Sequence, residues 1–235
     1  FSLWPLDTET ELIDGLANGM RGPRHFFNAY PNHAVSIQTP AAGEFMNVNT
    51  PADLDFLQAP GAGDTPLQQQ LSYWRNYHDW AMEGEPHHIG LAALEWLEAN
   101  RPAAEPTRLC WGDARIGNII YQQDGSDVAA LLDWEMATLG NPVQDIAWYC
   151  YIDSTFAEGL GMPRLEGLPS YADTARRWQE ATGLPLDDFD YYTLFAGMRY
   201  GLILSRIMLA TGQTAEIQGN FACKLLESKL VELGG

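Results

Sequence analysis

The chain has 235 residues, of which 46% are hydrophobic and 11% aromatic, so it carries enough apolar material for a sizeable folded core. Its formal net charge of −18 at pH 7 argues against a nucleic-acid partner, because the phosphate backbone would be repelled. The longest apolar candidate, residues 191–209, is interrupted by Arg199 and Arg206, so we expect no membrane span.

The cysteines indicate a reducing compartment. Cys110, Cys150 and Cys223 are far apart in the sequence and each lies among apolar residues, so buried free thiols are expected. The N-terminus has no basic region before an apolar stretch, and no signal peptide is evident. The sequence therefore predicts a cytoplasmic protein.

The first part of the chain gives weak structural signals. Short apolar stretches in residues 1–60 are interrupted by prolines, and only a helix over residues 9–18 is indicated. The segment Gly61-Ala62-Gly63 lies between prolines and has the composition of a linker. We therefore divide the chain into an N-terminal segment, residues 1–64, and a folded domain, residues 65–235.

Helical signals become clear from Thr65 onward. Thr65 is predicted to cap a helix, Pro66 suits its first position, and Gln68 completes a capping box. We expect His87-His88 to lie at a solvated helix start and not in a zinc site, because no cysteine or carboxylate is suitably spaced. Further helices are predicted over residues 90–100, 142–150, 170–182, 187–209 and 214–233.

Three short apolar runs between these helices predict strands. Leu109–Trp111 is too short for a helix and is broken by the glycine that follows. Ile119–Tyr121 and Val128–Leu132 flank a turn that contains Asp124-Gly125, a pattern typical of a β-hairpin. The sequence therefore predicts a small hairpin within a mainly helical domain.

Polar side chains lie next to the outer ends of this hairpin. Pairing of its strands would bring Asp113 and Asn118, which precede the first arm, close to Asp133, which follows the second. Oxygen ligands of this kind suit Mg²⁺, which commonly takes one or two protein side chains together with substrate phosphates. Phosphoryl transfer needs positioning and charge neutralisation more than covalent help, so these residues suit that chemistry.

The pattern Asp113-x-x-x-x-Asn118 followed by Asp133 resembles the aminoglycoside phosphotransferase family, which is related to the protein kinases. Residues 131–148 are similar to the branch whose kinase-like domains occur with acyl-CoA dehydrogenases. The resemblance implies an α+β, mainly helical fold: the C-terminal lobe of a protein-kinase-like fold, with a small β-hairpin carrying the catalytic and metal loops. The family's N-terminal sheet lobe carries a lysine and a glycine-rich cover that are not found in the first part of this chain, so we expect that lobe to be absent or degenerate.

By this resemblance, Asp113 would orient the substrate hydroxyl and accept its proton. Asn118 would bind one Mg²⁺, and Asp133 would bridge the metal to the nucleotide phosphates. Asp145 would be a structural residue that supports the catalytic loop. The family usually has histidine two residues before the catalytic aspartate, whereas this chain has Trp111. Because an indole has one N–H donor and does not titrate, Trp111 could support the loop but could not act as an acid or base.

Two further residues are candidates whose roles stay open. Arg115 lies inside the catalytic loop and is grouped with Asp113 as a candidate catalytic residue, where it would contact a phosphate or a substrate carboxylate. A salt bridge that supports the loop is an equal alternative. Glu135 would join the metal shell or contact a substrate cation, but its direction cannot be assigned from the sequence.

The chain also departs from a complete kinase in its lysines. Its only lysines are Lys224 and Lys229, whereas a kinase-like enzyme has a lysine in its N-terminal sheet lobe that contacts the α- and β-phosphates. We therefore expect the second lobe of a two-lobe enzyme. Another chain, a trimmed segment or an arginine such as Arg21 or Arg24 would complete the nucleotide pocket, although these arginines also suit plain loop positions.

These observations predict a phosphotransferase that moves the terminal phosphoryl of Mg²⁺-bound ATP or GTP to a hydroxyl of a small molecule. The expected partners are this small-molecule acceptor and either a separate N-terminal lobe or a second copy of the chain. The alternative is a non-catalytic, kinase-like binding or scaffold module that lacks a complete nucleotide site. The retained Asp113, Asn118 and Asp133 favour the enzyme, and the missing lysine favours the scaffold.

Overall fold

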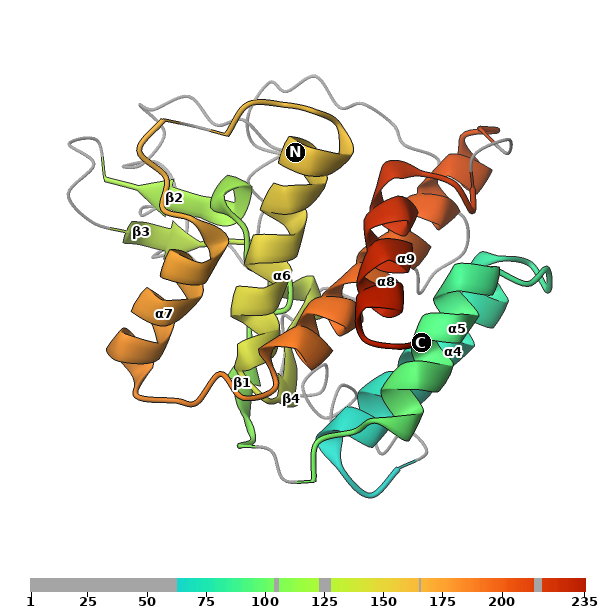
Figure 1. Ribbon diagram of the computed structural model, residues 1–235, viewed down its shortest axis with the longest axis horizontal. Helices are drawn as coiled ribbons and strands as arrows, with labels where there is room; N and C mark the ends of the chain where they lie inside the picture. Colours follow the sequence, from blue (N-terminus) through green and yellow to red (C-terminus); the bar gives the residue numbers. More distant parts are fainter. Residues whose placement is uncertain (1–62, 104–105, 123–127, 165, 214–216) are drawn as a thin grey trace, which may run out of the picture.

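The computed structural model describes residues 63–103, 106–122, 128–164, 166–213 and 217–235, which form a mainly helical structure with two small antiparallel sheets (Figure 1). The α+β, mainly helical fold class is therefore confirmed. The helix predicted over residues 9–18, Arg21, Arg24, the turn at Asp124-Gly125 and the expectation for an N-terminal sheet lobe concern residues outside this description. The domain boundary between residues 64 and 65 stays a prediction.

The elements follow one another in a simple order, with labels as in Figure 1. The helices are α4 (Pro66–Ala81), α5 (His88–Ala99), α6 (Val143–Ser154), α7 (Tyr171–Thr182), α8 (Phe189–Ala210) and α9 (Phe221–Glu232). The strands are β1 (Arg108–Cys110), β2 (Ile119–Tyr121), β3 (Val128–Leu131) and β4 (Thr138–Gly140). Short 3₁₀ turns cover Ile116–Asn118 and Trp134–Met136, and a π-helical turn covers Thr155–Gly159.

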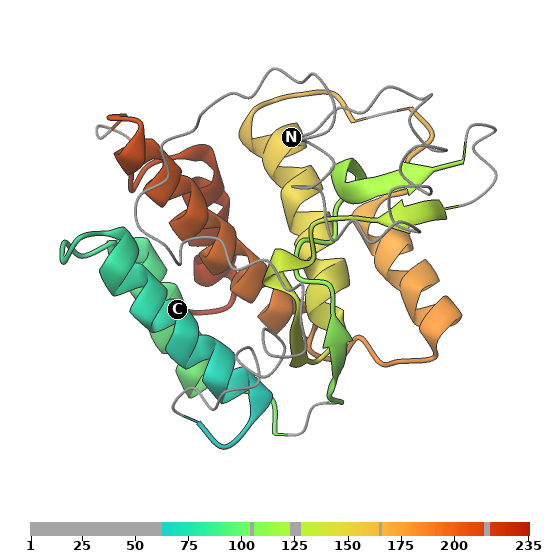
Figure 2. The ribbon, with the colours of Figure 1, turned by 180° about the vertical axis from the view of Figure 1, so that it is seen from behind.

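Helix α8 is the centre of the core. It contacts α4, α5, α6 and α9, while α7 packs on α6 (Figures 1 and 2). The β2–β3 sheet lies on the α6 side of the molecule, away from the α4–α5 pair, whereas β4 contacts α4 (Figures 1 and 2). The core side chains at these contacts are fully or almost fully buried, and they include Leu94, Leu97, Tyr192, Leu194, Phe195, Met198, Leu202 and Leu226.

Helix α4 forms as its sequence predicts. The Thr65 hydroxyl accepts a hydrogen bond from Gln68 N at 3.3 Å, and Gln68 Oε1 accepts one from Thr65 N at 3.1 Å, so the capping box is complete. The residues expected on one apolar face are all buried, namely Leu67, Leu71, Trp74, His78 and Ala81. Local capping and periodic burial therefore act together to fix this helix.

The strands form two separate pairs. The predicted hairpin is confirmed: β2 pairs with β3, with Ile119 opposite Leu131 and Ile120 opposite Ala130. Strand β1 pairs instead with β4, so that Cys110 lies opposite Thr138, and β4 was not predicted from the sequence. The β1–β4 pair brings the chain after Cys110 close to the start of α6.

Two helix starts differ from their predictions. The helix predicted to begin at residue 214 begins at Phe221, because Asn220 caps it by accepting a hydrogen bond from Cys223 N at 2.9 Å. His87 is not solvated but fully buried, and its Nδ1 caps α5 by accepting from Gly90 N at 3.0 Å. The His87 imidazole thus takes the place of the Ser, Thr, Asp or Asn side chain that usually caps a helix.

Helix α8 is long and apolar enough to cross a membrane by length and composition, and 50% of that apolar window is buried inside the molecule. A helix at the centre of a folded core has the same composition. The three cysteines are free and buried, as the sequence predicted.

Candidate active site

The loop after β1 is shaped by one glycine. Gly112 adopts φ 90°, in the region that favours glycine, and a Cβ atom there would overlap the carbonyl oxygen of Met136. The loop over residues 111–118 therefore packs directly against the 3₁₀ turn Trp134–Met136. This close approach brings the two predicted functional loops together.

Asp145 holds the same loop from the first turn of α6. Its Oδ2 accepts a hydrogen bond from Trp111 N at 2.7 Å, and its Oδ1 accepts one from Gly112 N at 2.8 Å. Burial raises the pKa of Asp145, while these two backbone bonds act in the opposite direction. The carboxylate thus satisfies two consecutive backbone donors of the loop.

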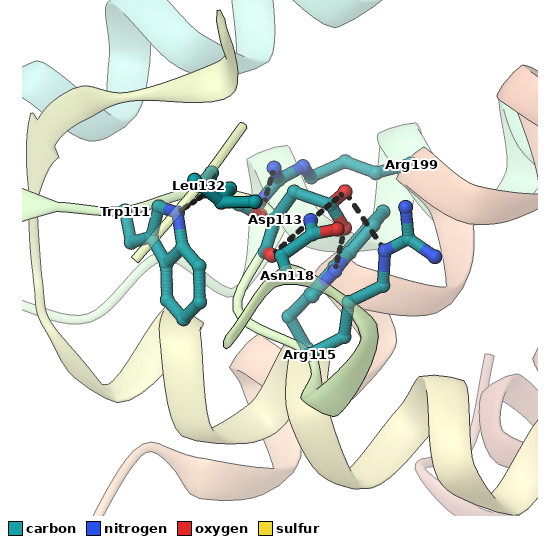
Figure 3. A network of polar contacts seen from close by, with 8 residues as sticks. Trp111, Asp113, Arg115, Asn118, Leu132 and Arg199 are labelled. Atoms are coloured by element: carbon teal, nitrogen blue, oxygen red, sulfur yellow. Dashed lines mark hydrogen bonds and ion pairs between the residues drawn. The ribbon is translucent and has the colours of Figure 1, made fainter. Parts of the chain in front are cut away.

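Trp111 connects the loop to the segment that precedes Asp133. Its indole Nε1 donates to the carbonyl oxygen of Leu132 at 2.7 Å (Figure 3). Its ring centroid lies 6.0 Å from that of Trp134. A single N–H donor is sufficient for this hydrogen bond. The tryptophan therefore joins the two loops by a direct hydrogen bond.

The Asp113 carboxylate is the centre of a hydrogen-bond network (Figure 3). Its Oδ2 accepts from Asn118 Nδ2 at 2.7 Å and from Arg115 Nε at 2.9 Å. Its Oδ1 accepts from the indole Nε1 of Trp148 at 2.9 Å. The side chain of Asp113 is 15% exposed, so this oriented carboxylate is still reachable from outside.

Asn118 is oriented by both backbone and side-chain bonds. Its Nδ2 donates to the Asp113 carbonyl oxygen at 3.1 Å as well as to the carboxylate, and its own carbonyl oxygen accepts from Leu132 N at 2.8 Å. Within the described structure its Oδ1 accepts no hydrogen bond. The amide therefore presents an unused oxygen next to Asp113, which suits a hard cation.

Asp133 and Glu135 add negative charge to the same region. Asp133 is exposed and adopts φ 55°, a left-handed conformation that is uncommon for residues other than glycine, although aspartate adopts it more often than most. The pKa of Glu135 is raised, first by partial burial and then by repulsion from Asp133 and Asp113, while Arg115 lowers it. Among the described residues, no three His, Cys, Asp or Glu side chains lie close enough to hold a metal by themselves.

Trp148 and Arg199 are two site residues that the sequence reasoning did not assign. Arg199 of α8 is buried, and its Nη2 donates to the carbonyl oxygen of Gly112 at 3.1 Å. Its guanidinium carbon lies 4.6 Å from the ring of Trp148, with Phe195 and Trp74 at 5.3 Å and 5.5 Å. The available signal for Arg199 was a charged residue in the middle of a 22-residue helix that carries only two other charged residues, Asp190 and Arg206.

Burial lowers the pKa of Arg199 to about 10, and the nearby Asp145 and Asp113 carboxylates oppose this shift. Arg199 therefore stays charged at neutral pH.

A shallow pocket opens beside Asp113. The pocket combines apolar side chains with charged ones, and it is lined by Arg115, Ile116, Gly117, Tyr149, Ile152, Asp153 and Phe156. The charged members are already paired, because Arg115 contacts Asp113 at 2.9 Å and Asp153 contacts Arg164 at 2.6 Å. One wall of this pocket comes from α6 and the π-helical turn, and the other from the turn Ile116–Asn118.

The described fold and this loop arrangement define a kinase-like phosphotransferase lobe. Residues 44–181, more than half of the chain, match the model of the phosphotransferase enzyme family called APH. The chain belongs to this family. The matched region begins within the segment predicted as residues 1–64.

Similar proteins agree with the branch that the sequence suggested. The chain is 31% identical over 145 residues to acyl-CoA dehydrogenase family member 10 of Mus musculus, covering 57% of the chain and 14% of that protein. It is 28% identical over 232 residues to probable acyl-CoA dehydrogenase IBR3 of Arabidopsis thaliana, covering 86% of the chain and 28% of that protein. The chain thus spans only a small part of these relatives, and the predicted branch is confirmed.

A solved structure agrees with the fold. A crystal structure from Ralstonia eutropha, provisionally named an aminoglycoside phosphotransferase, matches with a TM-score of 0.59 and 22% sequence identity. The match covers 78% of this chain and 60% of that one. The kinase-like fold predicted from the motifs is therefore confirmed.

Proposed function

We propose that this lobe transfers the terminal phosphoryl group of a Mg²⁺-bound nucleoside triphosphate to a hydroxyl of a small molecule. The observation that carries the proposal is the Asp113 carboxylate, which is oriented by hydrogen bonds on both oxygens and remains 15% exposed. A fixed acceptor of this kind suits the positioning of an attacking hydroxyl. Membership of the phosphotransferase family supports the same chemistry.

The residues near Asp113 fit a magnesium ion. Asn118 turns its amide nitrogen to Asp113 and leaves its oxygen unused, and Asp133 is exposed in the neighbouring loop. The raised pKa of Glu135 reflects, after burial, repulsion by Asp133 and Asp113, which a cation would relieve. In this proposal Asn118 and Asp133 hold Mg²⁺, and phosphate oxygens and water complete its shell.

Magnesium, when bound, would neutralise charge on the phosphates. Asp113 would hold the acceptor hydroxyl and take its proton. Arg115 pairs with Asp113 and is 30% exposed along its side chain, so it lies where an anionic group of either substrate would arrive. Glu135 would join the metal shell or contact a cationic group.

The nucleotide would need a further cation. The two lysines lie in α9, and Lys229 is already paired with Asp190 at 2.7 Å and Glu232 at 3.2 Å. We therefore propose that the phosphate contact made by a lysine in other kinases comes from outside residues 63–235 or from another chain. The phosphoryl donor in this proposal is ATP or GTP.

Calorimetric titration with ATP, with and without Mg²⁺, tests the proposal. We expect Mg²⁺-dependent binding that is lost in Asp133→Ala and kept in Glu95→Ala, which removes the same charge from an exposed position on α5. Asp113→Asn should keep this binding but lose phosphoryl transfer. Absence of nucleotide binding under every condition would refute the proposal for this chain and favour the scaffold alternative.

A further inference from the structure

The two oxygens of the Asp113 carboxylate are not equivalent. Oδ2 accepts two hydrogen bonds, from Asn118 at 2.7 Å and Arg115 at 2.9 Å, whereas Oδ1 accepts one, from Trp148 at 2.9 Å. A carboxylate oxygen offers about two lone-pair positions. Oδ2 is therefore fully used within the described structure, and Oδ1 has one acceptor position left.

Trp148 is well placed to fix this carboxylate. It lies in α6, one helical turn after Asp145, and its side chain is 2% exposed. Its indole packs edge-on against Tyr200 of α8, with ring centroids 6.0 Å apart. An indole buried between two helices has few alternative rotamers, so the direction of its N–H bond is set by the helix packing.

Arg199 holds this indole and the loop at the same time. Its guanidinium carbon lies 4.6 Å from the Trp148 ring, and its Nη2 donates to Gly112 O at 3.1 Å. Cation–π contact is strengthened when the cation is desolvated, and Arg199 is 2% exposed. The guanidinium therefore links the backbone just before Asp113 to the side chain that contacts the Asp113 carboxylate.

We propose that Trp148 is a positioning residue for Asp113, and that Oδ1 is the oxygen that receives the acceptor hydroxyl. Arg199 fixes Trp148 and the loop in this arrangement. The kinetic part of this inference rests on the proposed phosphotransferase function. The geometric part concerns only the contact between the indole and the carboxylate.

Proton–nitrogen NMR of the indole N–H groups tests the geometry without turnover. The Trp148 resonance is assigned by its absence in Trp148→Phe. In Asp113→Ala we expect this resonance to move upfield, because the indole N–H loses its acceptor. The resonance of Trp80, an exposed residue of α4, should stay in place, and the other indole resonances show that the fold is intact. A Trp148 resonance that does not respond to Asp113→Ala overturns the proposed contact. Asp113→Leu, which is close to aspartate in size and has no acceptor oxygen, repeats the test if the alanine variant unfolds.

Kinetics with Mg·ATP test the functional consequence, with water as the acceptor and phosphate release as the readout. Trp148→Phe keeps a ring over Arg199 but removes the N–H donor, so we expect kcat to fall roughly 10- to 100-fold. The KM for Mg·ATP should stay within about two-fold, because Trp148 does not contact the residues proposed to hold the metal. An unchanged kcat, or an equal loss in Mg·ATP affinity, overturns the positioning role.

Trp80→Phe is a matched control. Trp80 also lies under an arginine, with the Arg206 guanidinium carbon 4.5 Å from its ring, but it belongs to α4 and is 43% exposed. We expect this variant to keep both kinetic constants, and an equal fall in its kcat would overturn the specific role of Trp148. If the unmodified chain neither binds nor hydrolyses Mg·ATP, the proposed function fails, while the NMR result still decides whether Trp148 orients Asp113.

Discussion

Replacing Asp145 by alanine should destabilise the fold measurably. The change removes the acceptor for two backbone donors, Trp111 N at 2.7 Å and Gly112 N at 2.8 Å. Each hydrogen bond to a charged group contributes roughly 1.5–3 kcal/mol. Burial of this carboxylate, seen in its raised pKa, offsets part of the gain. We therefore expect the free energy of unfolding to fall by about 3 kcal/mol.

Urea unfolding followed by circular dichroism, with linear extrapolation, measures this loss. The equivalent fall in the midpoint of thermal unfolding is roughly 6–12 °C for a domain of this size. Asp145→Asn keeps one acceptor oxygen and should lose about half as much free energy. Glu95→Ala, on an exposed face of α5, should change little. A loss below about 1 kcal/mol in Asp145→Ala would show that the two bonds do not hold the loop as reasoned.

Two further predictions concern backbone and pH. Gly112→Ala and Gly84→Ala both place a side chain at nearly the same φ, 90° and 89°, but only Gly112 faces Met136 O. The positive φ alone should lower the free energy of unfolding of both variants by roughly 1 kcal/mol. Thermal unfolding should show a clearly larger loss of stability in Gly112→Ala than in Gly84→Ala. Equal losses would contradict the close contact between Gly112 and Met136 O. Burial, the largest cause, lowers the pKa of His87 from 6.5, so the unfolded chain binds its proton more readily. The free energy of unfolding should therefore be constant above about pH 6.5 and should decrease as the pH falls below it. Urea unfolding between about pH 7.5 and about pH 5.5 measures this decrease. The decrease should be smaller in His87→Asn, which does not titrate but keeps a capping side chain. An unchanged slope would exclude His87 as the cause.

Local signals predicted much of this fold. The capping box at Thr65 and the alternation of short apolar runs around Asp124-Gly125 depend on neighbours in the sequence, and α4 and the β2–β3 hairpin form as expected. Strand β4 was missed because three residues, Thr138–Gly140, carry no periodicity of their own. Its pairing with β1 is a tertiary contact that no local pattern records.

In the candidate site, too, the residues with a local sequence pattern were predicted and those placed by tertiary contacts were missed. Asp113, Asn118 and Asp133 were found through their spacing, and the structure brings Asp113 and Asn118 into direct contact. The contribution of Arg199 was missed because it reaches Gly112 from α8, far along the chain. His87 was misjudged because a buried imidazole that caps a helix has no sequence signal distinct from a solvated one. The roles of the site residues stay predictions.

The buried guanidinium of Arg199 sets the stability of this lobe against the ordering of its candidate site. Its Nε and Nη1 have no hydrogen-bond partner in the described part of the chain, so the desolvation of this charge is only partly compensated. An apolar side chain of similar length would avoid that cost, and selection for thermal tolerance alone would favour it. Such a change would also remove the contacts to Gly112 and Trp148. A lobe with higher stability and a less ordered Asp113 is therefore the expected product of selection that ignores activity.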